Sequence, residues 1–152
     1  MTHATIRQLL AAKDSVLYSV RGSDTVREAV HLMNDRHVGA LTVLNGETCK
    51  LNGIFTERDV LARVMARKRD PDKVRVEEVM TGSVHVISPE VTVEHAMSIM
   101  TKHRCRHLPV VTPTGLLGMI SIGDLTRWVS LAHQREADYL RDYLVGAPAT
   151  TV

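Results

Sequence analysis

Apolar residues recur with helical spacing in two stretches of the chain. They stand at positions 26, 29, 30 and 33, and again at positions 93, 96, 97 and 100. This i, i+3, i+4, i+7 pattern predicts one amphipathic helix in each stretch. Residues that favour helix starts come just before them, Ser23 with Thr25 in the first case and Ser88 with Pro89 in the second.

Short runs rich in β-branched residues flank each predicted helix and are typical of buried strands. Short lead-in helices are predicted over 6–12 and 76–80, and second helices are predicted to begin near Asp59 and Asp124. The predicted strands cover 16–20, 40–44 and 53–55 in the first half of the chain, and 84–87, 108–111 and 117–120 in the second.

The two halves repeat one another. Residues 25–44 align without gaps on residues 92–111, with six of the 20 positions identical, and GIFTERD at 53–59 matches GMISIGD at 118–124. The duplication predicts two copies of one β-α-β-β-α unit. A copy of about 55 residues buries its sheet poorly alone. We therefore expect an α/β (α+β) fold, in which both repeats pack as one pseudo-symmetric module followed by a C-terminal helix.

Composition narrows the classes of function. A net charge of +2 and an aromatic content of 3% do not favour a nucleic-acid or membrane partner. The basic run at 63–69 is interpreted as the exposed end of a helix, with nucleic-acid binding as the alternative. No stretch approaches the roughly 18 apolar residues of a membrane span. Cys49 and Cys105 are widely separated and suggest no disulfide framework, so a cytoplasmic protein is expected.

The closing sequences GIFTERD and GMISIGD, with Leu-Pro-Val-Val at 108–111, resemble those of tandem cystathionine-β-synthase (CBS) domains. The resemblance covers about residues 5–132. The Thr-Glu-Arg-Asp form at 56–59 is similar to that of small bacterial members. The resemblance implies a stand-alone regulatory pair, or Bateman module, that forms a homodimer and acts on a separate effector protein. The implied organisation is a lead-in helix at 1–13, a first CBS domain at 14–69, a linker at 70–78, a second CBS domain at 79–132, and a C-terminal helix and tail at 133–152.

The resemblance also implies two clefts between the copies that bind an adenine nucleotide. AMP is expected first, with ADP, ATP, NAD or S-adenosylmethionine as alternatives, and no cofactor is required. An Asp accepts hydrogen bonds from ribose hydroxyls, and a Thr or Ser donates toward phosphate near a helix N-terminus. The first cleft is ranked higher because Arg58 and Arg106 can hold phosphate. It combines Thr56, Arg58 and Asp59 with Val84, His85, Arg106, His107 and Pro109, and the second combines Leu17, Tyr18, Gly39 and Ala40 with Ser121 and Asp124.

The same motifs have simpler interpretations. Both closing sequences fit a helix-capping pattern, in which hydroxyl and carboxylate serve only the backbone. The chain would then be a constitutive interaction or structural module with vestigial clefts. No nucleophile–base pair, phosphate-binding loop or paired carboxylates appear in the sequence, so an enzyme is not expected.

Two further features of the sequence concern metal binding and self-association. Residues 103, 105 and 107 are His, Cys and His, which an extended strand could present as metal ligands, but Cys105 aligns with the apolar Val38 and no metal is expected. Apolar and aromatic residues recur on a helical stripe between 131 and 144. This stripe predicts a homodimer contact, with folding back onto the module as the alternative.

Overall fold

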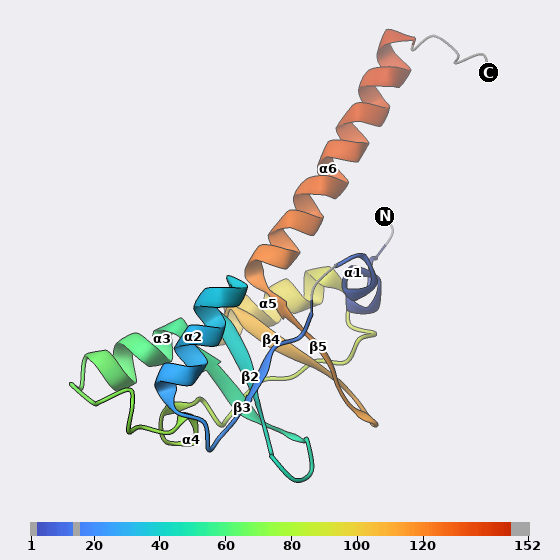
Figure 1. Cartoon of the computed structure of the whole chain (residues 1–152). Helices are drawn as coiled ribbons and strands as arrows, with labels where there is room; N and C mark the ends of the chain where they lie inside the picture. Colours follow the sequence, from blue (N-terminus) through green and yellow to red (C-terminus); the bar gives the residue numbers. More distant parts are fainter. Residues whose placement is uncertain (1–2, 14–15, 147–152) are drawn as a thin grey trace.

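The computed structural model describes residues 3–13 and 16–146. Two copies of one unit lie together, and a long helix extends from one end (Figure 1). The predicted α+β class, the two repeats and the C-terminal helix are confirmed. The elements in chain order are α1 (Ile6–Ala12), β1 (Ser19–Arg21), α2 (Val26–Arg36), β2 (Ala40–Leu44), β3 (Leu51–Thr56), α3 (Glu57–Asp59), the π-helix η1 (Val60–Met65), α4 (Val76–Val79), α5 (Val93–His103), β4 (His107–Thr112), β5 (Gly115–Ser121) and α6 (Ile122–Val145).

The two copies build small sheets with related connectivity. In the first copy, β1 pairs parallel with β2 and β2 pairs antiparallel with β3. In the second, β4 and β5 form the antiparallel pair, but the predicted strand over 84–87 is reduced to one parallel bridge between Ile87 and Val110. Ile87 donates to the Pro109 carbonyl and accepts from Val111. The strand prediction is wrong for 84–86, which form no strand and where Val86 is 45% exposed.

Helices α2 and α5 begin and end at equivalent residues. Thr25 and Thr92 are their N-caps, and each hydroxyl accepts the backbone N–H three residues further on. At the other end, His37 and Arg104 adopt left-handed conformations with φ of 55° and 52°. Non-glycine residues rarely adopt this conformation. Its occurrence at equivalent positions of both copies shows that the two helices end in the same way.

The lead-in helices are exchanged between the copies. Helix α1 precedes the first copy, but its Ile6 and Leu9 lie in the hydrophobic core of the second. The Ile6 N–H donates to the Val91 carbonyl at 2.8 Å, and the Val93 N–H donates to the Ala4 carbonyl at 2.9 Å. The start of the chain therefore belongs physically to the second copy.

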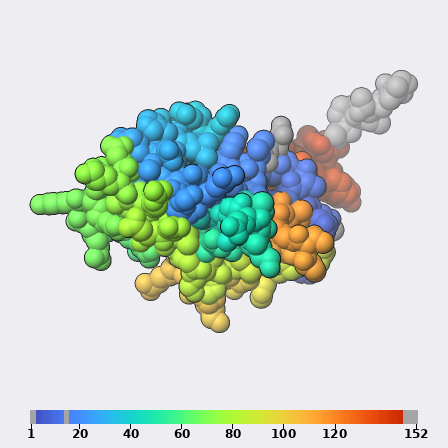
Figure 2. Space-filling view, turned by 60° about the horizontal axis from the view of Figure 1, so that its bottom comes forward, coloured from blue at the N-terminus to red at the C-terminus, as the bar shows by residue number. Residues whose placement is uncertain are grey.

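Helix α4 makes the reverse exchange. It precedes the second copy, yet Val76 and Val79, together with Val74, lie in the core of the first. The Val26 N–H donates to the Val74 carbonyl at 2.9 Å. The segment predicted as a linker, 70–78, thus supplies core residues, and both halves of the chain form one continuous body in the space-filling view of Figure 2.

The helices that follow the two sheets differ. In the first copy, α3 continues into η1, where the Ala66 N–H reaches back to the Leu61 carbonyl. In the second, α6 runs unbroken for 24 residues. The predicted C-terminal helix is therefore continuous with the last helix of the second copy, and the predicted tail at 147–152 lies outside the described residues.

Helix α6 leaves the body of the protein rather than folding back on it (Figure 1). Every residue from Ser130 to Gly146 is exposed. Within the ranges that the structure describes, no helix has both the length and the apolar character to cross a membrane.

A close backbone approach fixes α4 against the first sheet. A Cβ atom added at Gly53 would lie 2.5 Å from the Thr81 carbonyl oxygen. The neighbouring Ile54 exchanges two backbone hydrogen bonds with Thr81, at 3.0 and 2.9 Å. A glycine is required here because any larger residue must separate the two backbone segments.

We expect Gly53→Ala to lower the free energy of unfolding by about 1–3 kcal/mol, the usual range for overpacking. Gly82→Ala is the matched control, because a Cβ there meets nothing within 4 Å, and it should change stability by less than about 0.5 kcal/mol. Urea unfolding followed by circular dichroism measures both. Equal stability of the two variants would contradict the close approach.

Candidate ligand-binding site

The two closing motifs cap the helices that follow them. The Asp59 N–H donates to the Thr56 hydroxyl at 3.3 Å, and the Thr56 N–H donates to Asp59 Oδ2 at 3.0 Å. Ser121 and Asp124 form the same pair of bonds, at 3.1 and 2.8 Å. The capping interpretation is thus correct for both motifs. Whether a carboxylate can also bind a ligand depends on its other neighbours.

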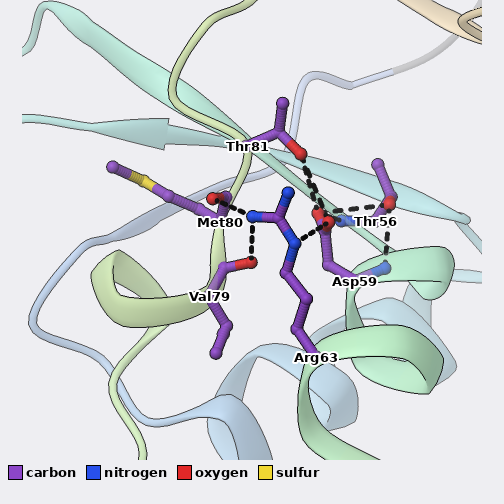
Figure 3. A network of polar contacts seen from close by, with 6 residues as sticks. All are labelled: Thr56, Asp59, Arg63, Val79, Met80 and Thr81. Atoms are coloured by element: carbon purple, nitrogen blue, oxygen red, sulfur yellow. Dashed lines mark hydrogen bonds and ion pairs between the residues drawn. The ribbon is translucent and has the colours of Figure 1, made fainter. Parts of the chain in front are cut away.

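Asp59 is enclosed by protein donors (Figure 3). The residue is only 5% exposed. The Thr56 hydroxyl lies 3.2 Å from Oδ2, and the Thr81 hydroxyl donates to Oδ1 at 3.2 Å. The guanidinium of Arg63 is the charged partner, with Nε 3.7 Å from Oδ1. A buried carboxylate that is already paired and hydrogen-bonded in this way is suited to a structural role.

Arg63 also ties η1 to the segment after α4. Its Nη1 donates to the carbonyls of Met80 and Val79, at 2.8 and 3.3 Å (Figure 3). Arg69, at the far end of the same basic run, pairs with Glu78 at 2.9 Å. Apart from the buried Val64 and the half-buried Arg69, the run 63–69 is exposed, as the helix-end interpretation expected. Arg63 and Arg69 in addition bind α4 and its continuation.

Asp124 occupies the equivalent position in the second copy but has different neighbours. Its Oδ2 accepts from the Ser121 N–H and, at 2.7 Å, from Nζ of Lys13, which also donates to the Met119 carbonyl. No described residue donates to Oδ1. Burial pushes the pKa of Asp124 up, but the bonds from Lys13 and Ser121 outweigh it and hold the pKa below the usual aspartate value. Asp124 is therefore ionised at neutral pH.

A cavity of about 1540 Å³ opens beside Asp124. Residues of both copies and of helices α1 and α6 line it. The structure thus brings apolar and backbone groups of the first copy into one space with a hydroxyl and a carboxylate of the second. All six residues that the sequence assigned to the second cleft lie on its walls: Leu17, Tyr18, Gly39, Ala40, Ser121 and Asp124.

The sequence interpretation missed the cationic residues of this cavity. It assigned no charge to the second cleft because it compared only positions within the repeat. Lys13 comes from the end of α1, Arg36 from the end of α2, and Arg127 and Arg135 from α6. The two α6 arginines follow Asp124 by three and eleven residues, which places all three on one face of a helix. This spacing could have identified them from the sequence.

Polar contacts among the residues assigned to the first cleft are few in the described structure. Of that set, only Thr56 hydrogen-bonds to Asp59 in the described structure. Arg58 and Arg106 are exposed, and neither forms an ion pair with a described residue. The cavity and its cationic lining lie at the second cleft, so the ranking of the first cleft above the second stays a prediction.

The remaining first-cleft residues lie in other surroundings. His107 lines the cavity beside Asp124, and burial lowers its pKa against the upward pull of Asp124 and Glu57, so its imidazole is neutral at pH 7. Pro109 is buried in β4. Val84 is half-buried, and the exposed His85 stacks on His103 with ring centroids 3.8 Å apart.

The His-Cys-His alternation does not present three ligands on one surface. His103 is exposed at the end of α5, while Cys105 packs against the second core, where burial raises the pKa of its thiol. Among the described residues, no three His, Cys, Asp or Glu side chains are placed to hold a metal ion.

Comparison with known proteins identifies the repeats. The CBS domain family model matches the chain twice, over residues 7–66 and 76–131. The mitochondrial CBS domain-containing protein CBSX3 of Arabidopsis thaliana is 40% identical over 126 residues, which are 81% of this chain and 61% of that protein. The chain therefore spans less than two thirds of that relative. CBS domain-containing protein YhcV of Bacillus subtilis is 36% identical over 107 residues, 70% of this chain and 74% of YhcV.

Solved structures show the same fold. A protein with CBS domains from Burkholderia ambifaria MC40-6 aligns with a TM-score of 0.77 and 34% identity, covering 98% of this chain and 99% of its own. The hexameric CBS-CP12 protein from bloom-forming cyanobacteria aligns with a TM-score of 0.67 and 36% identity, covering 73% and 64%. Together with the two family matches, these alignments show that the chain belongs to the CBS-domain family and carries two CBS domains in tandem.

Proposed function

We propose that the cavity beside Asp124 is a regulatory binding site for an adenine nucleotide. CBS pairs are generally regulatory ligand-binding modules. The observation that carries the proposal is the meeting, in one large cavity, of Leu17, Tyr18 and Ala40 from the first copy with Ser121 and Asp124 from the second. Neither copy alone contains this combination, so ligand binding would depend on how the copies are packed.

The chemistry of these groups suits a nucleotide. Asp124 is ionised, and its Oδ1 accepts no bond from the described residues, so it is available to the vicinal hydroxyls of a ribose. The capped N-terminus of α6, with its positive dipole end, favours a nearby phosphate. The side chains and backbone around Tyr18 and Ala40 provide an apolar surface for a base.

The two CBS domains are proposed to have different roles. Asp59 is buried and bonded to Thr56, Thr81 and Arg63, which favours a structural role for the first closing motif. For this motif alone, the constitutive alternative fits better than ligand binding. The second motif is then the regulatory one.

Helix α6 offers a route by which occupancy reaches another protein. It begins at the cavity with Ser121 as its N-cap and continues to exposed apolar residues at its far end, including Tyr143 and Leu144, 76% and 80% exposed. A helical segment of about 16 residues is marginal alone in water. We propose that this end of α6 contacts a second copy of the chain in a homodimer and that a separate effector protein reads the change.

The binding site is tested by thermal unfolding with AMP, ADP, ATP, NAD and S-adenosylmethionine. A ligand present at 100 times its dissociation constant should stabilise the protein by about 2.7 kcal/mol. We expect Asp124→Asn to abolish the ligand-induced shift and Asp59→Asn to retain it, even if the latter lowers the starting midpoint. A shift unchanged in Asp124→Asn refutes the site, and no shift with any ligand favours the constitutive alternative.

The electrostatics of the site are tested with Lys13→Met. Without the lysine, burial dominates and the pKa of Asp124 should rise. In the wild type, the depressed pKa contributes stability above the ordinary aspartate value of about 3.9, which is lost as pH falls through the folded pKa. In Lys13→Met this acid-dependent loss should shrink. Carbon-13 NMR titration of the Asp124 carboxyl measures the change. Arg27→Met, which removes an exposed pair with Asp72 away from the cavity, is the control and should leave that pKa unchanged, whereas an unmoved pKa in Lys13→Met contradicts the pairing.

The homodimer is tested with Leu140→Glu, because Leu140 is 50% exposed beside Tyr143 and Leu144 on α6. A buried carboxylate is costly, so the variant should weaken self-association by about tenfold or more, measured by analytical ultracentrifugation. Gln134→Glu adds the same charge about 120° away around the helix and should have little effect. Equal association of the two variants would exclude this end of α6 as the contact.

A further inference from the structure

The cavity beside Asp124 is strongly cationic. Among the described residues of its lining, five side chains are lysine or arginine, and Asp124 is the sole carboxylate. Like charges lining one space repel each other, and a ligand of opposite charge relieves that repulsion. The five cationic residues are Arg7, Lys13, Arg36, Arg127 and Arg135.

Three of these cations have no acidic partner within 3–13 and 16–146. Arg7 pairs with Glu90 and Lys13 pairs with Asp124. Arg36, Arg127 and Arg135 form no ion pair with any described residue. The Arg36 guanidinium lies over the ring of Tyr18, 5.4 Å from its centroid. These three groups can therefore bind an anion without first breaking an ion pair of the protein.

Two arginines of α6 lie on the same face of the helix as Asp124. Residues 124, 127, 131 and 135 are spaced by three or four, so they share one face of the helix, and all four line the cavity. At 1.5 Å per residue, Arg135 lies about 16 Å along the axis from Asp124. The family match ends at residue 131, so Arg135 belongs to the part of α6 that extends the cavity beyond the CBS frame.

The size of the cavity fits an extended ligand. Pockets for small molecules usually measure about 300–1,000 Å³, and this one measures about 1540 Å³. A nucleoside monophosphate carries one anionic group and would leave most of the cationic lining without a counter-charge. A chain of two or more phosphates extends both the charge and the length of the ligand.

We propose that this cavity selects a nucleoside polyphosphate, with at least two linked phosphates, over the monophosphate or the nucleoside. The inference rests on the proposed function and deepens it. Asp124 holds the ribose and the first phosphate lies near the N-terminus of α6. The linked phosphates extend from there along α6 toward Arg127 and Arg135, which determine specificity. Guanidinium groups suit this role because they bind phosphate oxygens through charge-assisted, often bidentate hydrogen bonds. The preference differs from the AMP that the family resemblance led us to expect first.

Isothermal titration calorimetry of the full chain with adenosine, AMP, ADP and ATP tests the proposal. Affinity should rise about tenfold or more from AMP to ATP, as expected for added charge-assisted hydrogen bonds. In Arg127→Gln and Arg135→Gln, ATP affinity should fall about tenfold while AMP affinity changes by less than about threefold. Arg141→Gln is the matched control, because Arg141 lies on the same helix beyond the cavity and faces Asp138 at 3.8 Å. Circular dichroism of the ligand-free variants verifies that each is folded.

The outcomes separate the two proposals. Equal affinity for AMP and ATP, or an ATP affinity that neither Arg127→Gln nor Arg135→Gln changes, overturns the polyphosphate preference and leaves the nucleotide site standing. If none of the four compounds binds the folded wild-type protein, both proposals are overturned. Loss of ATP affinity in Arg141→Gln to the same extent would show a general effect of helix charge and also overturn the assignment to the cavity.

Discussion

The exchange of the lead-in helices is the constraint on which the rest of the structure depends. Ile6 and Leu9 of α1 complete the second core, while Val76 and Val79 of α4 complete the first. The core of each copy is therefore complete only when the lead-in helix of the other copy is in place. Since the buried apolar surface of each copy includes the other copy's lead-in helix, the two cannot separate without exposing it. The cavity lies between elements that this exchange holds together.

The same exchange makes two nearly identical motifs chemically different. Thr81, which follows α4, donates a hydrogen bond to Asp59, and Arg63 forms an ion pair with the same carboxylate. Lys13, which follows α1, donates to Asp124 at the wall of a large cavity. Its side chain is a single flexible cation. One carboxylate is enclosed by donors, and the other keeps an oxygen without a described donor. Duplication gives both copies the capping box, and the exchanged segments decide which copy is suited to a ligand.

Local patterns predicted much of this structure. The apolar stripe predicted α2 and α5, and the repeated closing sequences placed Thr56, Asp59, Ser121 and Asp124 at helix starts. The first strand of the second copy was predicted wrongly over 84–86, because of residues 84–87 only Ile87 pairs with β4 and Val86 is exposed. The exchange and the cationic lining could not be predicted from the repeat, since both depend on tertiary contacts of α1 and α6. A comparison of equivalent positions in the two repeats did not identify Arg127 and Arg135. Both lie on the same face of α6 as Asp124.

The central claim is that a nucleotide binds beside Asp124, between the two CBS domains, and not at Asp59. Titration of the isotopically labelled protein with ATP, followed by backbone amide NMR, tests it most directly because it locates the ligand without a mutation. The account predicts that the largest shifts fall on residues 17–18, 39–40 and 121–124, with Lys13 perturbed as its bond to Asp124 changes. Shifts centred on Thr56, Asp59 and Thr81, or no saturable shifts at all, would contradict it.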